Sequence, residues 1–225
     1  MHRNYFNYFT EIEEYFTRKR GKNLLVSPLD WCLIELWKEN GVPLHIVLRG
    51  IDRSFESAAK RAKKPPTTLH YCHPAVMEAF EEYQEGAVGS HPEEEPSEEA
   101  GLPRERVLAF IEDLHRQIVD RPEDPSKRAA KRLEALAAEV GRAHSVRLEA
   151  LDLELTGIRR TLVGELSEGL EAERLKEVHK EARRETRAYR KRLSPEMYDR
   201  LLEKHLESKL GELFDLPEFS LIHLE

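Results

Sequence analysis

The chain has 225 residues, of which 40% are hydrophobic and 35% are charged. An average globular domain has about 45–50% apolar and about 25% charged residues, so long solvated faces are expected here. A formal net charge of −7 excludes a protein that is basic over its whole surface, and any nucleic-acid-binding surface must therefore be local.

Cysteine content and hydropathy predict a protein of the reducing cytoplasm. The two cysteines, Cys32 and Cys72, are too few for a disulfide framework. The first residues lack the apolar run of a signal peptide, and no stretch approaches 18 consecutive apolar residues. We therefore expect a cytoplasmic location and no membrane association.

Residues 87–103 differ in composition from the rest of the chain. They contain five glutamates and three prolines with few large apolar residues, a composition that cannot bury enough surface to offset the entropy of ordering. The sequence therefore predicts three parts. They are an aromatic-rich module over residues 1–86, an acidic linker over 87–103 and a helical domain over 104–225.

The N-terminal module is expected to begin with an amphipathic helix. Aromatic and aliphatic residues recur from Tyr5 to Phe16 at spacings of three and four, and Gly21 would end the helix. The apolar residues 24–26 are too few for a helix and are expected to be extended. Ser27-Pro28-Leu29-Asp30 then supplies a capping serine, a proline in the first turn and a carboxylate, which together predict a helix start.

This second helix is expected to end near Asn40-Gly41, and Pro43 opens a third, so that the two meet in a helix-turn-helix-like corner. Residues Thr67–Cys72 are β-branched and aromatic, which favours a short strand, and Pro74 begins another helix. We therefore predict a mainly α protein with a winged-helix-like N-terminal module that contains minor β structure.

The C-terminal domain is expected to be helical. Apolar spacings of three and four predict helices over about 104–119 and from Leu148 to Leu166, and Ser194-Pro195 starts a last one. An apolar tail follows Pro217 and is expected to dock on these helices or on a partner. We predict a helical bundle or hairpin that mediates association.

Three glycines interrupt the helical pattern of this domain. Gly157, Gly164 and Gly169 each cost a helix about 1 kcal/mol relative to alanine. One of them is therefore expected to mark a break or a close helix crossing.

Positive charge on the N-terminal module gives the first candidate site. Arg49, Arg53 and Lys60 follow each other at spacings of four and seven, which places them on one helical face. In a winged-helix module this face would contact phosphates. The alternative is a solvated face in which acidic neighbours balance the charge. The predicted nucleic-acid-binding residues are Arg49, Arg53, Lys60, Arg61, Lys63 and Lys64, flanked by Arg18, Lys19, Arg20 and Lys22.

A second basic segment runs from Lys176 to Arg192 and contains eight basic and three acidic residues. Arg183, Arg187 and Arg190 lie close to one stripe of the expected helix, which could follow a nucleic-acid backbone or an acidic partner. Glutamates at every fourth position equally fit an exposed helix with internal ion pairs.

Signatures of catalysis and metal binding are weak. His70, Cys72 and His73 could each bind zinc, but no second pair of ligands accompanies them. Cys32 lies in an apolar helix, where burial makes a thiol inert. The sequence has no nucleophile-elbow, phosphate-loop or zinc-protease motif. We therefore expect no catalytic residues, no metal and no cofactor.

The sequence favours a non-enzymatic, nucleic-acid-associated factor that uses its basic helix-turn-helix face, with DNA or RNA as the partner. The alternative is a helical adaptor or assembly subunit that binds a protein partner or forms a homo-oligomer through its C-terminal helices. Candidate partner-binding residues for this alternative are Trp31, Trp37, Phe219, Leu221 and Ile222.

Overall fold

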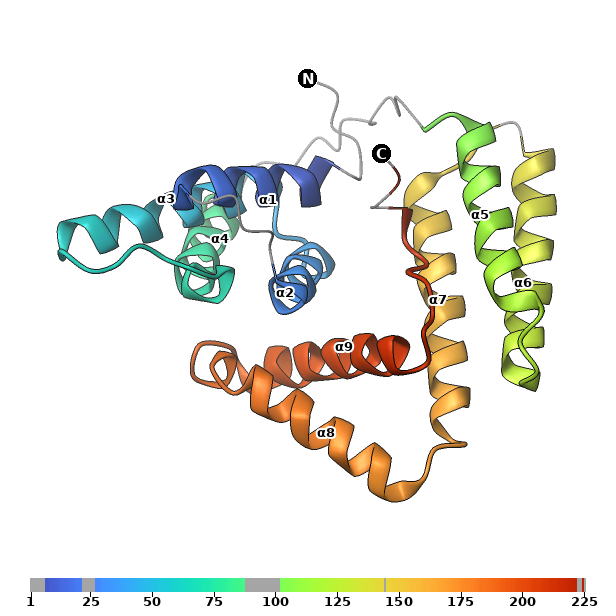
Figure 1. The fold of residues 1–225 in the computed structure, drawn as a ribbon. Helices are drawn as coiled ribbons and strands as arrows, with labels where there is room; N and C mark the ends of the chain where they lie inside the picture. Colours follow the sequence, from blue (N-terminus) through green and yellow to red (C-terminus); the bar gives the residue numbers. More distant parts are fainter. Residues whose placement is uncertain (1–6, 22–26, 88–101, 144, 222–223, 225) are drawn as a thin grey trace. The chain divides into compact units, whose positions relative to one another are not determined.

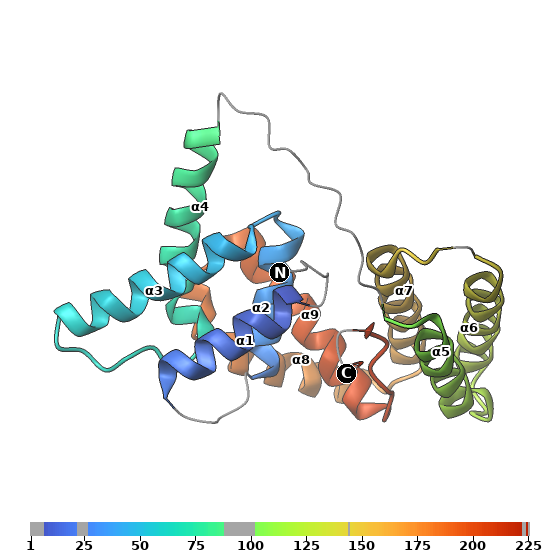
Figure 2. The ribbon, with the colours of Figure 1, turned by 90° about the horizontal axis from the view of Figure 1, so that it is seen from above.

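The computed structural model describes residues 7–21, 27–87, 102–143, 145–221 and 224. These residues form only helices and connecting turns (Figures 1 and 2). The first helices are α1 (Asn7–Arg20), α2 (Pro28–Glu39), α3 (Leu44–Lys60), the 3-10 helix η1 (Leu69–Tyr71) and α4 (His73–Ala87). They are followed by α5 (Arg104–Val119), α6 (Asp124–Arg142), α7 (Leu148–Ser167), α8 (Ala172–Thr186), the 3-10 helix η2 (Tyr189–Lys191) and α9 (Pro195–Leu213).

The prediction of a mainly α fold is confirmed, whereas the winged-helix-like module with minor β structure is wrong, because the described residues contain no strand. Thr67–Cys72 forms η1 instead of a strand. Leu69 and Cys72 are both fully buried, and residues three apart share one side of a 3-10 turn but opposite faces of a strand. The predicted extended segment 24–26 lies outside the described residues.

The chain divides into two compact units, and each unit is built from separate stretches of sequence. The described residues of unit 1 lie within Glu98–Glu181 and Leu206–Glu225, and those of unit 2 within Asn7–Ser97 and Ala182–His205. The segment 182–205, which the sequence places in the C-terminal domain, therefore packs with the N-terminal module. Most of the predicted linker, residues 88–101, lies outside the described residues.

In unit 2, the start and end of α2 follow the local sequence as predicted. The Ser27 side chain accepts a hydrogen bond of 3.1 Å from the Asp30 backbone N–H. At the other end, Gly41 has a φ of +71°, and Val42 N–H donates to the Trp37 carbonyl at 3.0 Å. This left-handed turn is the usual end of a helix at glycine. The core beneath α2 includes Phe9, Ile12, Phe16, Leu33, Leu36 and Trp37, all nearly or fully buried.

The α3–α4 pair of unit 2 crosses closely at Gly50. A Cβ atom at this position would lie 2.5 Å from the Val76 Cα atom, a distance that real side chains do not reach. By contrast, α7 of unit 1 runs unbroken through Gly157 and Gly164, where a Cβ atom would meet nothing within 4 Å. Gly169 follows the end of α7. Among the described glycines, Gly50 therefore makes a close helix crossing that the sequence did not indicate.

We expect Gly50→Ala to lower the stability of unit 2 by about 1–3 kcal/mol, because the added methyl group meets the backbone of α4 rather than a movable side chain. Gly157→Ala is the matched control. It should raise the free energy of unfolding by about 0.5–1 kcal/mol, because alanine lowers the conformational entropy of the unfolded chain and fits the helical backbone without a clash. Urea denaturation of both variants measures the difference. Equal effects of the two substitutions would contradict the close crossing.

Unit 1 is built on a hairpin of α5 and α6 that packs against α7. Its core contains four apolar residues of α5, Val107, Ile111, Leu114 and Ile118, together with Leu151, Leu155, Ile158 and Leu162 of α7. The C-terminal tail adds Phe219 and Leu221, both fully buried. Of the two docking possibilities expected for this tail, the described part therefore docks on its own chain.

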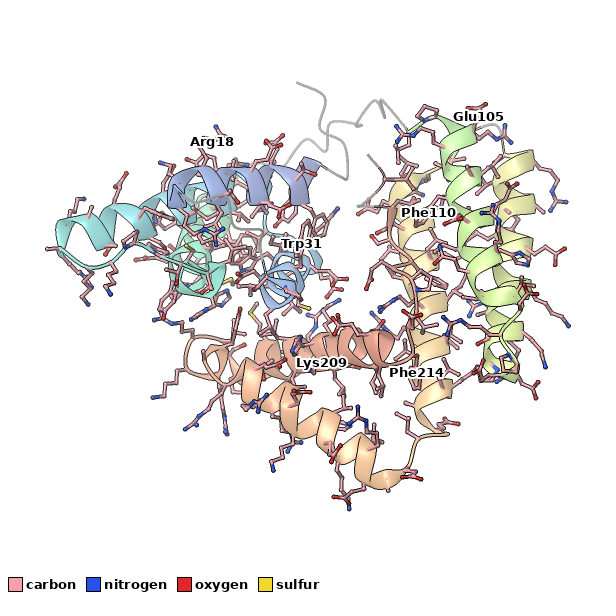
Figure 3. All side chains as sticks on the ribbon, viewed as in Figure 1. Arg18, Trp31, Glu105, Phe110, Lys209 and Phe214 are labelled. Carbon is pink, nitrogen blue, oxygen red and sulfur yellow. The ribbon has the colours of Figure 1, made fainter. Side chains whose placement is uncertain are left out.

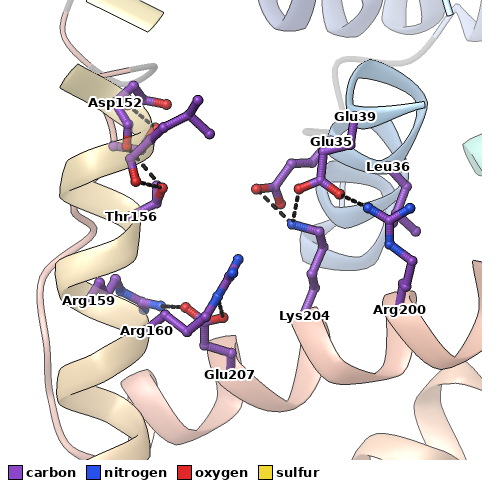
Figure 4. A network of polar contacts seen from close by, with 12 residues as sticks. Glu35, Leu36, Glu39, Asp152, Thr156, Arg159, Arg160, Arg200, Lys204 and Glu207 are labelled. Atoms are coloured by element: carbon purple, nitrogen blue, oxygen red, sulfur yellow. Dashed lines mark hydrogen bonds and ion pairs between the residues drawn. The ribbon is translucent and has the colours of Figure 1, made fainter. Parts of the chain in front are cut away.

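Buried polar groups of α7 hold the tail in place (Figure 4). Asp152 Oδ1 accepts hydrogen bonds from the Leu221 backbone N–H at 2.6 Å and from the Ser220 hydroxyl at 3.0 Å. Arg159, only 6% exposed, donates to the Pro217 carbonyl at 3.2 Å and to a Glu218 carboxylate oxygen at 2.8 Å. Backbone groups of the tail are thus hydrogen-bonded at or near the positions at which its apolar side chains enter the core.

Candidate nucleic-acid interface

The segment 182–205 is joined to the N-terminal module by polar contacts with α2. Lys204 Nζ lies 2.9 Å from a Glu35 carboxylate oxygen and 2.8 Å from one of Glu39, and Arg200 pairs with Glu39 at 2.6 Å (Figure 4). Burial alone would lower the pKa of Lys204, but the charge of Glu35 and the hydrogen bonds to both carboxylates outweigh it and raise the pKa. These contacts fix one face of α9 on α2.

A buried carboxylate, Asp30, links α2 to both 3-10 helices. It is 1% exposed, accepts a hydrogen bond of 2.9 Å from the Leu69 backbone N–H, and accepts a second of 3.2 Å from the Tyr189 hydroxyl. Burial raises the pKa of Asp30, and the hydrogen bonds it receives partly oppose this. Burial followed by the charge of Asp30 also raises the pKa of Tyr189. Asp30 therefore acts as both a helix-start residue and a long-range connection.

The predicted ligand-like residues around η1 are used in packing. The Thr68 hydroxyl lies 2.7 Å from His70 Nδ1, and His73 Nδ1 accepts a hydrogen bond of 2.9 Å from the Trp37 indole. Burial lowers the pKa of each histidine to about 4, with a smaller contribution from Arg192 at His70. Burial also raises the pKa of the Cys72 thiol to about 12. Both rings are therefore neutral at pH 7, and the thiol is protonated.

Two of the arginines predicted to contact phosphate are engaged with α4. Arg53 makes two hydrogen bonds to the Glu82 carboxylate, at 2.8 and 2.7 Å. Arg49 donates to the Ala79 carbonyl at 2.9 Å and lies 4.0 Å from the same carboxylate. The two side chains do share one face of α3, as their spacing indicates, but that face meets another helix of the module.

The flanking cluster at the end of α1 is partly engaged as well. Lys19 forms an ion pair of 2.7 Å with Asp52, and Arg20 donates to the Thr67 carbonyl at 3.1 Å. Arg18 is exposed (Figure 3). Its guanidinium carbon lies 5.8 Å from the centroid of the Tyr15 ring. Lys22 lies outside the described residues. This cluster therefore offers one exposed cation without a described acidic partner.

Lys60, Arg61, Lys63 and Lys64 form an exposed turn that we call the basic loop. The turn is held by its backbone, since Lys63 N–H donates to the Ala58 carbonyl at 2.9 Å and Ala62 has a φ of +49°. Within the described part of the chain, none of the four cations lies within 4.0 Å of a carboxylate. The basic loop thus carries four solvated positive charges on five residues.

A second exposed group, here called the basic corner, contains Arg187, Arg190, Lys191 and Arg192 between α8 and α9. The nearest glutamate in sequence, Glu185, has a carboxylate oxygen 2.7 Å from His205 Nε2. As in the basic loop, no described carboxylate forms an ion pair with any of the four residues. The sequence predicts these residues as the end of a longer helix, 176–192, whereas α8 ends at Thr186.

η1 follows the basic loop in sequence and contacts the basic corner. Its exposed Tyr71 ring lies beneath the Arg192 guanidinium, whose carbon is 4.4 Å from the ring centroid. The centroid of the His70 ring lies 4.1 Å from that of Tyr71 and 4.6 Å from that of Tyr189. Tyr71 therefore contacts a cation of the basic corner that lies more than 120 positions away in sequence.

The predicted partner-binding residues lie largely in the two cores. Trp37, Phe219 and Leu221 are fully buried. Trp31 is half-buried and stacks on Phe9 with the ring centroids 5.9 Å apart. Ile222 lies outside the described residues. Apolar contact with a partner at Trp37, Phe219 or Leu221 would therefore require the cores to open.

Two further properties concern the described residues alone. No three or more of their histidine, cysteine and acidic side chains are grouped as a metal ion would need. None of their helices combines the length and apolarity needed to cross a membrane.

Comparison with known proteins covers the N-terminal part of the chain. A family model described as "Uncharacterised protein" matches residues 7–91. No curated protein and no solved structure matches the chain. The matched segment coincides with the N-terminal portion of unit 2 and stops before the segment 182–205 that packs with it.

Proposed function

We propose that unit 2 binds the phosphate backbone of a nucleic acid through the basic loop and the basic corner. The observation that carries the proposal is the uneven use of cations in unit 2. Arg53, Lys19 and Lys204 are paired with carboxylates, whereas the eight cations of the loop and corner are exposed and have no acidic partner among the described residues. Polyanions bind such surfaces because neutralising phosphates releases condensed counterions.

The proposal changes the residues expected to touch phosphate. Arg49 and Arg53 both contact α4, because Arg53 pairs with Glu82 and Arg49 donates to the Ala79 carbonyl. The basic corner takes their place as the partner of the basic loop. The adaptor alternative receives less support, because three of its five candidate anchors, Trp37, Phe219 and Leu221, are fully buried.

The test is fluorescence anisotropy of the full-length protein with labelled duplex DNA, single-stranded DNA and RNA at about 50 and about 200 mM salt. Contact with about four phosphates predicts a loss of affinity of about 50- to 150-fold between these two concentrations. The variant Arg187→Glu/Arg190→Glu/Lys191→Glu should bind at least about tenfold more weakly and with a smaller salt slope.

A control with the same change in net charge is Arg106→Glu/Lys131→Glu/Arg132→Glu, whose three exposed residues lie in unit 1. This variant should retain the affinity of the natural sequence within about threefold. Equal losses in both triple variants would attribute binding to net charge rather than to the basic corner. If the protein binds none of the three nucleic acids, the proposal fails and the adaptor alternative takes its place.

A further inference from the structure

The neighbouring rings of Tyr71, His70 and Tyr189, here called the aromatic column, indicate which kind of nucleic acid would bind. The Tyr71 side chain is 45% exposed. The other large hydrophobic side chains that are exposed among the described residues, Val119, Leu153 and Leu213, are aliphatic. Cations, backbone N–H groups and hydroxyl groups, including that of tyrosine, contact phosphates, but the face of an aromatic ring does not take part in such contacts. The exposed ring of Tyr71, which contacts Arg192 of the basic corner, therefore has no role in the proposed function as stated so far.

The column is anchored on its buried side. Tyr189 and His70 are 4% and 6% exposed. Tyr189 is bonded to Asp30, and the same carboxylate oxygen receives the backbone N–H of Leu69 inside η1. The position of Tyr71, on which the Arg192 guanidinium rests, is thus set by buried contacts on its inner side, so little conformational freedom remains to be lost when a base stacks on the Tyr71–Arg192 pair.

The outer side of the column ends in a guanidinium group. Arg192 is exposed and covers the Tyr71 ring at 4.4 Å, an arrangement that holds the planar group over the aromatic ring. Unpaired bases stack on aromatic rings and on arginine planes, whereas the bases of a duplex are already stacked and do not present their faces. Arg187, Arg190 and Lys191 are exposed and close to Arg192 in sequence, and they would supply the contacts to flanking phosphates.

We infer that Tyr71 and Arg192 form a stacking position for an unpaired base, so that unit 2 prefers single-stranded nucleic acid over duplex. This inference rests on the proposed function and specifies its substrate class. The cations supply affinity for any polyanion, and the column adds affinity only where a base is free to stack.

The test compares the full-length protein with Tyr71→Leu, Tyr71→Phe and Arg192→Lys on three probes of equal length. The probes are a single-stranded oligonucleotide, the same oligonucleotide with consecutive abasic sites, and a duplex. Tyr71→Leu should weaken binding to the intact single strand by about 5- to 150-fold, with no change for the abasic strand or the duplex. Tyr71→Phe should retain binding, and Arg192→Lys should lose part of it although the charge is unchanged.

The outcomes distinguish base stacking at Tyr71 from phosphate contact at the basic corner. If Tyr71→Leu binds all three probes as the natural sequence does, while the Arg187/Arg190/Lys191 variant loses binding, phosphate contact stands and base stacking is wrong. Equal weakening on intact and abasic strands also overturns stacking. Absence of binding by the natural sequence overturns both. Tryptophan fluorescence checks that Tyr71→Leu is folded, because Trp31 and Trp37, the only two tryptophans, both lie in unit 2.

Discussion

Tyr189→Ala is expected to destabilise unit 2 by about 3–5 kcal/mol, the range found for deleting a buried aromatic side chain. The substitution removes a ring that is 4% exposed and whose centroid lies 4.6 Å from that of the His70 ring. It also deletes the hydroxyl that donates to the buried Asp30 carboxylate across 159 positions of sequence. The loss should appear as a lower midpoint of urea denaturation followed by tryptophan fluorescence.

Tyr189→Phe separates the two contributions. It keeps the ring but deprives Asp30 of one donor, which should cost about 1–3 kcal/mol. Tyr198→Phe is the matched control, because its hydroxyl makes only a partly buried contact of 3.2 Å with Thr186, and it should cost less than about 1 kcal/mol. If Tyr189→Ala leaves the fluorescence midpoint unchanged, the segment 182–205 does not complete the core of unit 2.

The second large effect is expected at Phe219. Phe219→Ala should lower the stability of unit 1 by about 3–5 kcal/mol, because the ring is fully buried and its removal leaves a cavity among the residues of α7 and the tail. Circular dichroism at 222 nm records this loss, since the tryptophan signal comes from unit 2 alone. A dichroism transition identical to that of the natural sequence would contradict the docking of the tail.

Ser220→Ala is the control for Phe219→Ala. It removes the hydroxyl that bonds Asp152 but leaves the stronger contact between the Leu221 N–H and the same oxygen. The expected cost is about 1 kcal/mol or less. A larger effect at Ser220 than at Phe219 would mean that polar contacts rather than burial hold the tail.

Helix limits were largely predictable from the sequence because they depend on neighbouring residues. Ser27 caps α2 as expected, Gly41 ends it, and α5 spans Arg104–Val119 as its apolar spacing predicts. Each of these features is decided within one or two turns, where capping and periodicity act.

Contacts between distant segments could not be predicted in the same way. The spacing of Arg49 and Arg53 gave their shared face correctly but contained nothing about Glu82, which stands on another helix. Asp30 was identified only as a helix-start carboxylate, although it also bonds Leu69 and Tyr189. Thr67–Cys72 has the composition of a strand, yet burial of Leu69 and Cys72 against the module selects a 3-10 turn. In each case tertiary packing decided the outcome, and local propensity carries no information about it.

The interleaving of the two units in sequence has a consequence for biosynthesis. A ribosome releases the chain from the N-terminus, so residues 7–91 emerge early but lack Tyr189, Arg200 and Lys204 until the ribosome has passed position 205. Unit 1 in turn awaits Phe219 and Leu221. The core of unit 2 can therefore be completed only after residue 205 has been made, and the core of unit 1 only after residue 221. Each core stays incomplete while the segment inserted between its two parts is being made, and apolar surface exposed in that interval favours misassembly.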